Sequence, residues 1–247
     1  VIATSAKIRL QVFKSLVSTC KVRNILFEKV LFQKLSEYEE ASSMLELNEI
    51  SSWVNCSRRA WPIYKEVKHL LKEKKNISFR LTGGLWGMGC NSIHFIDIFE
   101  WLTVSKLSRI DIRGLDSKII FSKRQGFQEF TGILELLFNN DNKLFLESNS
   151  KEIPSLIEIS AQDLSIKIDE SSGTLISKKE NKIETENFPT PFQSDLSNLI
   201  ASDILIKNKT ILPSFSESAR QHILMLAAFQ RHIENISGKK IDHCPIT

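Results

Sequence analysis

Three polar side chains recur at every third position of a segment that is otherwise strongly apolar. Asn91, His94 and Asp97 fall on one side of a helix with about 3.6 residues per turn, directly after a glycine-rich turn at residues 83–89. Burying an unpaired amide, imidazole or carboxylate costs about 1 to 3 kcal/mol, so these groups should face a wet cavity, a ligand or a hydrogen-bonded network. A cavity would make this segment an active site. The alternative is a buried core histidine that is satisfied by a hydrogen bond to Asp97.

The bulk properties of the 247-residue chain are those of an ordinary globular protein. It is 42% hydrophobic and 25% charged, and its net charge of +4 comes from interspersed basic and acidic residues, which is too mild for a nucleic-acid surface. No apolar run reaches about 18 residues, so no membrane span is expected. The four cysteines lie far apart, which predicts neither a metal site nor a disulfide framework and favours a reducing compartment. We therefore expect a cytoplasmic protein without a metal, a membrane span or a nucleic-acid partner.

The first hundred residues alternate between short apolar strands and amphipathic helices. This alternation is typical of a parallel sheet with crossover helices. Strands are predicted at residues 1–4, 24–28, 51–56 and 77–81. The helices between them are predicted from about Ile8, at about 35–47 and at about 62–72. Ser36 and Glu39 have the spacing of a capping box at the start of the second helix.

From about residue 105 the hydrophobic period changes to two, which predicts an antiparallel sheet with one open face. The alternation is clear at residues 109–113, 134–138, 144–147 and 164–169, and the polar run 139–142 predicts a hairpin loop. Two helices are expected at about 194–206 and 216–236. The apolar stripe of the last helix consists of Phe215, Ala219, Ile223, Leu226, Phe229, Ile233 and Ile236. His222 and His232 lie away from this stripe, so we expect both at the surface.

This order of elements and several local motifs resemble the glucose-fructose oxidoreductase and inositol dehydrogenase (Gfo/Idh/MocA) family. Residues 1–4 resemble an apolar strand of the family that ends in Ala-Thr-Pro, with Ser5 in place of the proline, and Glu28-Lys29-Val30 resembles its Glu-Lys-Pro motif. Residues 55–62 resemble its Asn-Arg-Arg-Phe-x-Pro segment with a two-residue difference in spacing, and residues 83–101 resemble its Gly-Gly followed by His-x-x-Asp-x-x-x-Trp. Residues 138–144 resemble a strand-turn-strand of its open sheet.

The resemblance implies an α/β fold followed by an α+β fold. Residues 1–56 would be the C-terminal half of a Rossmann-type parallel sheet, and residues 57–247 a substrate-binding and oligomerisation domain with a large open, mainly antiparallel sheet. It also implies an oxidoreductase that uses NAD or NADP on a sugar, polyol or nucleotide sugar, and a homo-oligomer formed through the open sheet. The family's Gly-x-Gly-x-x-Gly motif is absent from the sequence, so the resemblance places it upstream of Val1 and predicts weak cofactor binding by this chain alone.

The resemblance assigns Lys29 to catalysis, beside the nicotinamide and the reacting hydroxyl. A lysine suits this chemistry because alcohol oxidation removes a proton as hydride leaves carbon, and an ammonium stabilises the developing alkoxide. The alternative is a lysine at the end of a strand that points to solvent. Thr4, Glu28 and Lys29 are expected at the nicotinamide end of the cofactor site.

The helix after the glycine-rich turn is expected to supply the other catalytic residues. His94 would be an acid/base or a hydroxyl ligand, and a different alignment on the glycine puts Asn91 at the family's histidine position. The family's aspartate four residues before the histidine is Cys90 here. Asn91 can donate a hydrogen bond to a hydroxyl or accept one from it, but it cannot carry a proton.

Four further residues are predicted to bind the substrate: Asp97, Arg58, Arg59 and Trp86. Arg58 and Arg59 can make bidentate contacts with a carboxylate or phosphate, which suits a nucleotide-linked sugar; the alternative is a structural salt bridge. A second hypothesis for the whole protein is a non-catalytic scaffold or sensor that kept the fold. The replacement of the motif proline by Val30, together with Cys90, favours that hypothesis.

Overall fold

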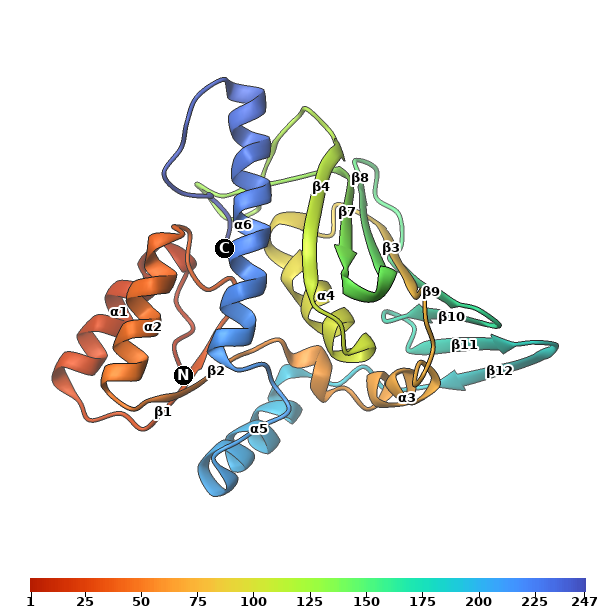
Figure 1. Ribbon diagram of the computed structural model, residues 1–247, viewed down its shortest axis with the longest axis horizontal. Helices are drawn as coiled ribbons and strands as arrows, with labels where there is room; N and C mark the ends of the chain where they lie inside the picture. Colours follow the sequence, from red (N-terminus) through yellow and green to blue (C-terminus); the bar gives the residue numbers. More distant parts are fainter.

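Two sheets of unequal size organise the chain, with one long helix between them (Figure 1). The computed structural model describes residues 1–247. The smaller sheet pairs β1 (Asn24–Phe27) with β2 (Ser51–Val54) in parallel. Helices α1 (Ala6–Thr19) and α2 (Ser36–Leu47) flank this sheet. The β-α-β unit predicted by the sequence is therefore present, with strands that end one or two residues earlier than expected.

The strand expected at residues 1–4 is reduced to a single bridge. Ile2 pairs in parallel with Phe27, and α1 begins four residues later. The N–H of Ile2 donates to the carbonyl of Leu26, and the N–H of Glu28 donates to the carbonyl of Ile2. These bonds hold the first residues of the chain beside the end of β1, where Thr4 and Lys29 were predicted to meet.

The predicted capping box at the start of α2 is wrong. Ser36 makes no capping hydrogen bond, although the helix begins there. The carboxylate of Glu37 instead accepts hydrogen bonds from the N–H groups of Gln33 and Lys34. The backbone is already helical at Leu35, so the N–H groups that need a partner lie before Ser36 in the chain. A side chain that capped the helix from Ser36 would point to N–H groups that follow it.

Eight strands form the larger sheet: β3 (Ser78–Gly84), β4 (Leu107–Leu115), β7 (Gly132–Phe138), β8 (Lys143–Asn149), β9 (Leu156–Ala161), β10 (Leu164–Asp169), β11 (Thr174–Lys179) and β12 (Lys182–Asn187). Their spatial order is β12-β11-β10-β9-β3-β8-β7-β4. All neighbours are antiparallel except β3 and β8, which are parallel. A separate short ribbon pairs β5 (Ile120–Phe121) with β6 (Gln128–Glu129).

The strand expected at residues 77–81 belongs to this larger sheet and not to the parallel sheet of the first fifty residues. In β3 the buried Phe79 and Leu81 alternate with the half-buried Arg80 and Thr82. That alternation is the pattern of a strand with one covered and one open face, whereas a strand buried in a parallel sheet is apolar on both faces. β3 therefore joins the mixed sheet near its middle.

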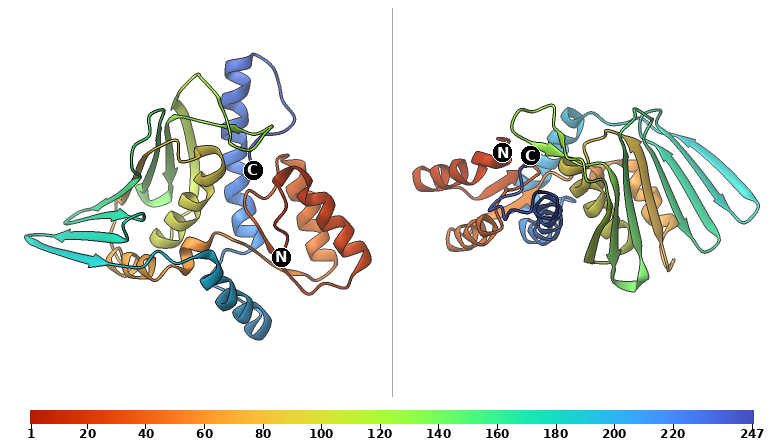
Figure 2. Two further views of the ribbon diagram at one scale, coloured as in Figure 1. Left: turned by 180° about the vertical axis from the view of Figure 1, so that it is seen from behind. Right: turned by 90° about the horizontal axis from the view of Figure 1, so that it is seen from above.

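Helices cover one face of the larger sheet and leave the other face open (Figure 2). α4 (Met88–Thr103) packs on the covered face, and α6 (Phe215–Ser237) packs against both α4 and β4. Along β10, Leu164, Ile166 and Ile168 are buried while Ser165 and Lys167 are exposed. The half-buried antiparallel strands and the hairpin at residues 139–142 are thus confirmed.

Two further helices complete the fold. α3 (Pro62–Leu70) has its proline at the first helical position, where no N–H is needed. α5 (Gln193–Lys207) packs a stripe of three aliphatic residues on Trp53 of β2. No helix of the chain combines the length and the apolar character required to cross a lipid bilayer.

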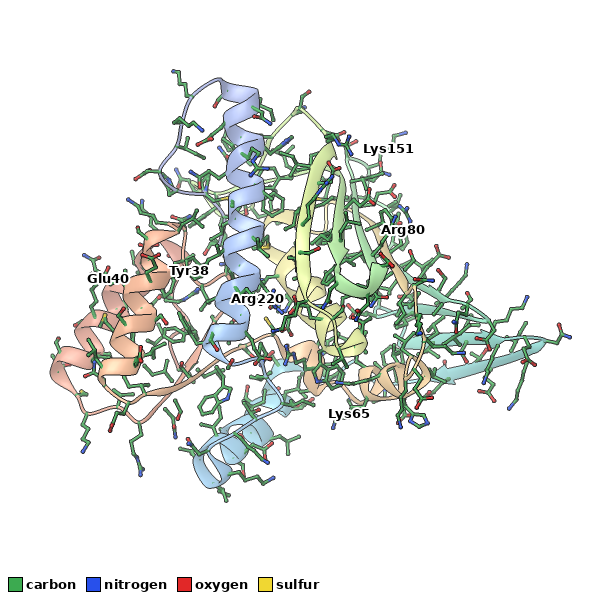
Figure 3. All side chains as sticks on the ribbon, in the orientation of Figure 1. Tyr38, Glu40, Lys65, Arg80, Lys151 and Arg220 are labelled. Atoms are coloured by element: carbon green, nitrogen blue, oxygen red, sulfur yellow. The ribbon has the colours of Figure 1, made fainter.

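The prediction that His222 and His232 lie at the surface is wrong, because both are buried. α6 has neighbours on several sides, so more than one stripe of the helix is covered. His222 packs near the ring of Tyr38, which α2 presents toward α6 (Figure 3), and its Nδ1 lies 2.8 Å from the carbonyl oxygen of Ser218. Conversely, Ile223 and Ile236 of the predicted apolar stripe are partly exposed.

Candidate active site

The polar side of α4 begins at a turn that depends on glycine. Gly87 immediately precedes the helix with a φ of 78°, in the left-handed region that side-chain-bearing residues rarely adopt. The carboxylate of Glu129 accepts hydrogen bonds from the N–H groups of Gly89 and Cys90 in the first turn. This carboxylate satisfies free N–H groups of the helix and fixes its first turn against β6.

A cavity of about 190 Å³ lies between α4 and the covered face of the larger sheet. Its lining combines a few polar groups with apolar and aromatic side chains, as in many small-molecule sites. The lining residues are Arg58, Leu81, Trp86, Asn91, His94, Phe95, Ser155, Ile157, Ile168 and Glu170. Four residues predicted from the sequence, Arg58, Trp86, Asn91 and His94, therefore meet at one cavity.

Lys29 does not line this cavity, but it contacts Asn91, which does. Its Nζ donates to Oδ1 of Asn91 at 2.9 Å and to the carbonyl oxygen of Cys90 at 3.0 Å. Asn91 in turn donates from Nδ2 to the carbonyl of Trp86 at 2.8 Å, which fixes the orientation of its amide. Burial lowers the pKa of Lys29 from its ordinary value. The structure thus brings Lys29 and Asn91 together from segments that are about sixty residues apart.

His94 faces the cavity as a neutral imidazole. Its Nδ1 is buried and has no hydrogen-bond partner in the protein. Burial, reinforced by the positive charges of Arg58 and Lys29, holds the pKa of His94 well below its ordinary value. The expectation that Asp97 orients this ring does not hold, because the Asp97 carboxylate is bound elsewhere. An unpaired ring nitrogen beside a cavity is available to a ligand hydroxyl.

Asp97 and Arg59 form a buried ion pair with each other. The guanidinium of Arg59 donates from Nε to Oδ2 at 2.9 Å and from Nη2 to Oδ1 at 2.7 Å. Burial raises the pKa of Asp97 to about 6, although the charge and hydrogen bonds of Arg59 act in the opposite direction. Neither side chain lines the cavity. The predicted contact of Asp97 and Arg59 with a substrate therefore has no support in the geometry, which instead matches the structural salt bridge.

Arg58 forms a second bidentate pair, at the cavity. Its Nε and Nη2 donate to the two carboxylate oxygens of Glu170 at 2.8 and 2.7 Å, and the hydroxyl of Tyr64 donates to the same carboxylate at 2.5 Å. The guanidinium also lies 4.5 Å from the ring centroid of Phe95. Burial disfavours the charged carboxylate, but the charge and hydrogen bonds of Arg58 outweigh it and lower the pKa of Glu170. Glu170 was not predicted as part of the site.

Nothing in the sequence around Glu170 indicates this position. Glu170 directly follows β10 in a polar turn that reads as a solvent-exposed hairpin. Ser155, which precedes β9, is a further cavity residue without a local signal. Both reach the cavity only because β9 pairs with β3, which carries the chain into α4, and β10 pairs with β9.

Trp86 presents its ring to the cavity and anchors its polar end in the sheet. Its Nε1 donates to the carbonyl of Glu147 at 2.8 Å, and its ring packs edge-on against Phe95. Because the indole N–H is already satisfied, only the apolar part of Trp86 is free to contact a ligand. Stacking on a sugar face stays a prediction for this residue.

Thr4 and Glu28 lie near the end of β1, where the first residues of the chain pair with that strand. Glu28 accepts a hydrogen bond from Asn55 Nδ2 at 2.5 Å. The Oγ1 of Thr4 is buried and has no hydrogen-bond partner in the protein. The peptide bond between Lys29 and Val30 is cis. An unsatisfied hydroxyl and a carboxylate thus flank the segment that carries Lys29.

The arrangement of the whole chain is similar to that of several solved oxidoreductase structures. UDP-N-acetylglucosamine 3-dehydrogenase GnnA from Acidithiobacillus ferrooxidans superposes with a TM-score of 0.71 at 13% identity, over 94% of this chain and 78% of that protein. An oxidoreductase from Agrobacterium radiobacter, solved in complex with NAD+, L-tartaric acid and magnesium, gives 0.71 at 15% identity, over 97% and 78%. This chain has the Gfo/Idh/MocA fold.

The Gfo/Idh/MocA fold also occurs in a super-repressor mutant of Gal80p from Saccharomyces cerevisiae. It superposes with a TM-score of 0.71 at 14% identity, over 96% of this chain and 80% of that protein. No protein-family model matches the sequence, and no curated protein matches it. At these identities the likeness establishes the fold, so the activity must be argued from the residues of the cavity.

Proposed function

We propose that this protein is an oxidoreductase that transfers a hydride between a nicotinamide cofactor and a hydroxyl group of a sugar or polyol. The observation that carries the proposal is Lys29, whose partly buried amine lies 2.9 Å from Oδ1 of the cavity residue Asn91. The Gfo/Idh/MocA fold supports it, because the similar structures include a sugar-nucleotide dehydrogenase and an oxidoreductase with bound NAD+.

Lys29 has the properties needed to handle the hydroxyl proton. Alcohol oxidation requires a base to take this proton as hydride leaves carbon. Because burial lowers its pKa, Lys29 releases its own proton more readily than a surface lysine and can then accept one from the substrate. In the reverse direction the ammonium returns the proton. Asn91 holds the amine in place, and neutral His94 offers a ring nitrogen to another hydroxyl.

The residues at the predicted cofactor end fit the nicotinamide half of NAD or NADP. The cofactor supplies the hydride acceptor when it is bound. Thr4, Glu28 and Lys29 would hold that half, and the unsatisfied Oγ1 of Thr4 is the group that a carboxamide can pair with. The sequence contains no Gly-x-Gly-x-x-Gly turn for the phosphates.

The test is hydride transfer by the purified protein. NAD+ and NADP+ are each offered with a panel of sugars, polyols and nucleotide sugars, and the absorbance of the reduced nicotinamide is followed, while calorimetry measures cofactor binding. Lys29→Ala should abolish turnover and leave the circular dichroism spectrum unchanged. Lys65→Ala is the matched control, because Lys65 is exposed on α3 (Figure 3). Full turnover in the Lys29→Ala variant would remove Lys29 from the mechanism.

A second candidate is a protein that binds a sugar without turning it over. It is favoured by the two hydrogen bonds that already occupy the amine of Lys29, and by the pairing of Asp97 with Arg59, which removes the one acid among the three polar residues of α4. The similarity to a super-repressor mutant of Gal80p is compatible with this candidate. Sugar binding without reduction of either cofactor, and without formation of any product, would favour it. We also propose that the protein forms a homo-oligomer through the open sheet. Light scattering, which measures the molar mass in solution, tests this.

A further inference from the structure

The charged lining of the cavity consists of one arginine and one glutamate that neutralise each other. Arg58 and Glu170 are the only charged residues among the lining side chains. They are joined by two hydrogen bonds, and their side chains keep 18% and 20% of their surface exposed. Lys29, the next cation, contacts Asn91 and not the cavity itself. The cavity therefore presents polar groups without a net charge.

The pair still has hydrogen-bonding capacity to offer to a ligand. A guanidinium has five N–H donors, and Glu170 takes one from Nε and one from Nη2 of Arg58. The carboxylate has about four acceptor sites, of which Arg58 and Tyr64 fill three. One acceptor site and several donors therefore lie side by side, which is the combination that a hydroxyl group satisfies as donor and acceptor.

An anionic group would be poorly accommodated at this end of the cavity. A ligand carboxylate or phosphate would compete with Glu170 for Arg58 and would be repelled by it. The size of the cavity points the same way, because about 190 Å³ is below the roughly 300 to 1,000 Å³ of pockets that bury drug-sized ligands. One hydroxylated ring fits these constraints better than a whole nucleotide sugar. The earlier expectation that Arg58 binds a phosphate is revised accordingly.

We propose that Glu170 is a specificity-determining residue that makes the cavity select a neutral, hydroxyl-bearing ring over its carboxylated counterpart. By occupying Arg58, Glu170 prevents the arginine from binding a ligand anion, and the remaining donors and acceptor of the pair bind ring hydroxyls. Tyr64 holds the carboxylate in place from α3. The inference rests on the proposed function only in taking this cavity as the substrate site.

The experiment compares neutral sugars with the corresponding uronates, without cofactor. D-glucose and D-glucuronate, and D-galactose and D-galacturonate, are titrated against the full chain, and binding is followed by tryptophan fluorescence, since Trp86 lines the cavity, with calorimetry as a second measurement. The wild-type protein should bind the neutral member of at least one pair about ten- to a hundredfold more tightly, the range of a hydrogen bond to a charged group. Glu170→Gln should narrow or reverse this ratio, because Arg58 then becomes free to bind the uronate.

Glu147→Gln is the matched control. Glu147 also pairs with an arginine, Arg80, but this pair lies on the open face of the same sheet, on the side away from α6 (Figure 3). Its substitution should leave the neutral-to-uronate ratio unchanged. If Glu170→Gln does not fold, the double variant Arg58→Met/Glu170→Gln removes both charges, and it should lose about tenfold in affinity for the neutral sugar without gaining affinity for the uronate.

Four results would overturn the inference: a wild-type preference for the uronates, an unchanged ratio in Glu170→Gln, an unchanged affinity for the neutral sugar in the double variant, or no binding of any of the four sugars. The proposed function fails separately, because it requires hydride transfer. A protein that selects neutral sugars through Glu170 and never reduces a nicotinamide would retain this inference and lose the oxidoreductase assignment.

Discussion

Two adjacent arginines make almost the same contact in different surroundings. Arg58 and Arg59 follow one another in a short 3-10 helix (Ser57–Ala60), and each holds a carboxylate through Nε and Nη2. The Arg59–Asp97 side chains are 8% and 0% exposed, whereas the Arg58–Glu170 side chains are 18% and 20% exposed and border the cavity. The sealed pair can only support the fold. The Arg58–Glu170 pair, which is partly exposed at the cavity, can also contact a ligand.

Replacing Arg59 by Met should have the largest effect, because it leaves Asp97 buried without a counter-charge. We expect the free energy of unfolding to fall by about 3 to 5 kcal/mol. Urea denaturation followed by circular dichroism measures the change. Arg80→Met is the control: its pair with Glu147 is partly exposed, and its loss should cost at most about 1 kcal/mol. A smaller loss for Arg59→Met than for Arg80→Met would contradict the structural role of the sealed pair.

The cost of losing Arg59 should depend on pH. Burial raises the pKa of Asp97 to about 6, above its ordinary value of 3.8, so the folded protein binds this proton more tightly than the unfolded chain. Ionisation of Asp97 therefore lowers stability as the pH rises from about 4 to about 6, and without Arg59 the pKa rises further and this loss extends to higher pH. We expect Arg59→Met to be less destabilising at about pH 5 than at about pH 8. Urea denaturation at both values measures this, and equal destabilisation would show that Asp97 keeps its charge in the variant.

Replacing Arg58 by Met should affect ligand binding more than folding. Water in the cavity can solvate the partly exposed Glu170, so we expect a stability loss of about 1 to 2 kcal/mol, well below that for Arg59→Met. Binding of a neutral sugar should weaken by about tenfold, because the donors at the end of the cavity are lost. Fluorescence titration and urea denaturation of the same preparation separate the two effects. The comparison of the two pairs fails if the Arg58 variant is as unstable as the Arg59 variant.

The smallest effect is expected at His94, the cavity group that carries no charge. Because its pKa lies well below the ordinary value, the ring stays neutral near neutral pH, and sugar binding should show no step around pH 6.5. His94→Gln should weaken binding by about two- to tenfold, the range of one neutral hydrogen bond. Titrations at about pH 5.5 and about pH 7.5 measure the first expectation. A step near pH 6.5 that disappears in His94→Gln would show that the ring titrates.

Local patterns predicted most of the elements. The period of two in residues 164–169 and the apolar stripe around Leu226 each reflect a face that is buried along one element, so the residues themselves carry the information. The same reasoning failed for β3, whose partners lie up to about eighty residues away, and for His222, which a second helix covers. A short stretch of sequence contains no information about which distant element covers the remaining faces of a strand or helix.

The sequence by itself determined a glycine-dependent turn, a helix with Asn91 and His94 on one side, and a lysine at the end of β1, because these depend on backbone conformation and on periodicity. Only the tertiary structure decided that Arg58 meets Glu170 at a cavity while Arg59 is sealed against Asp97. The two arginines are identical in type and adjacent in the chain. Their difference comes from the elements that supply the two carboxylates: Glu170 follows β10 beside the cavity, whereas Asp97 is buried in α4, and burial and charge pairing depend on neighbours in space.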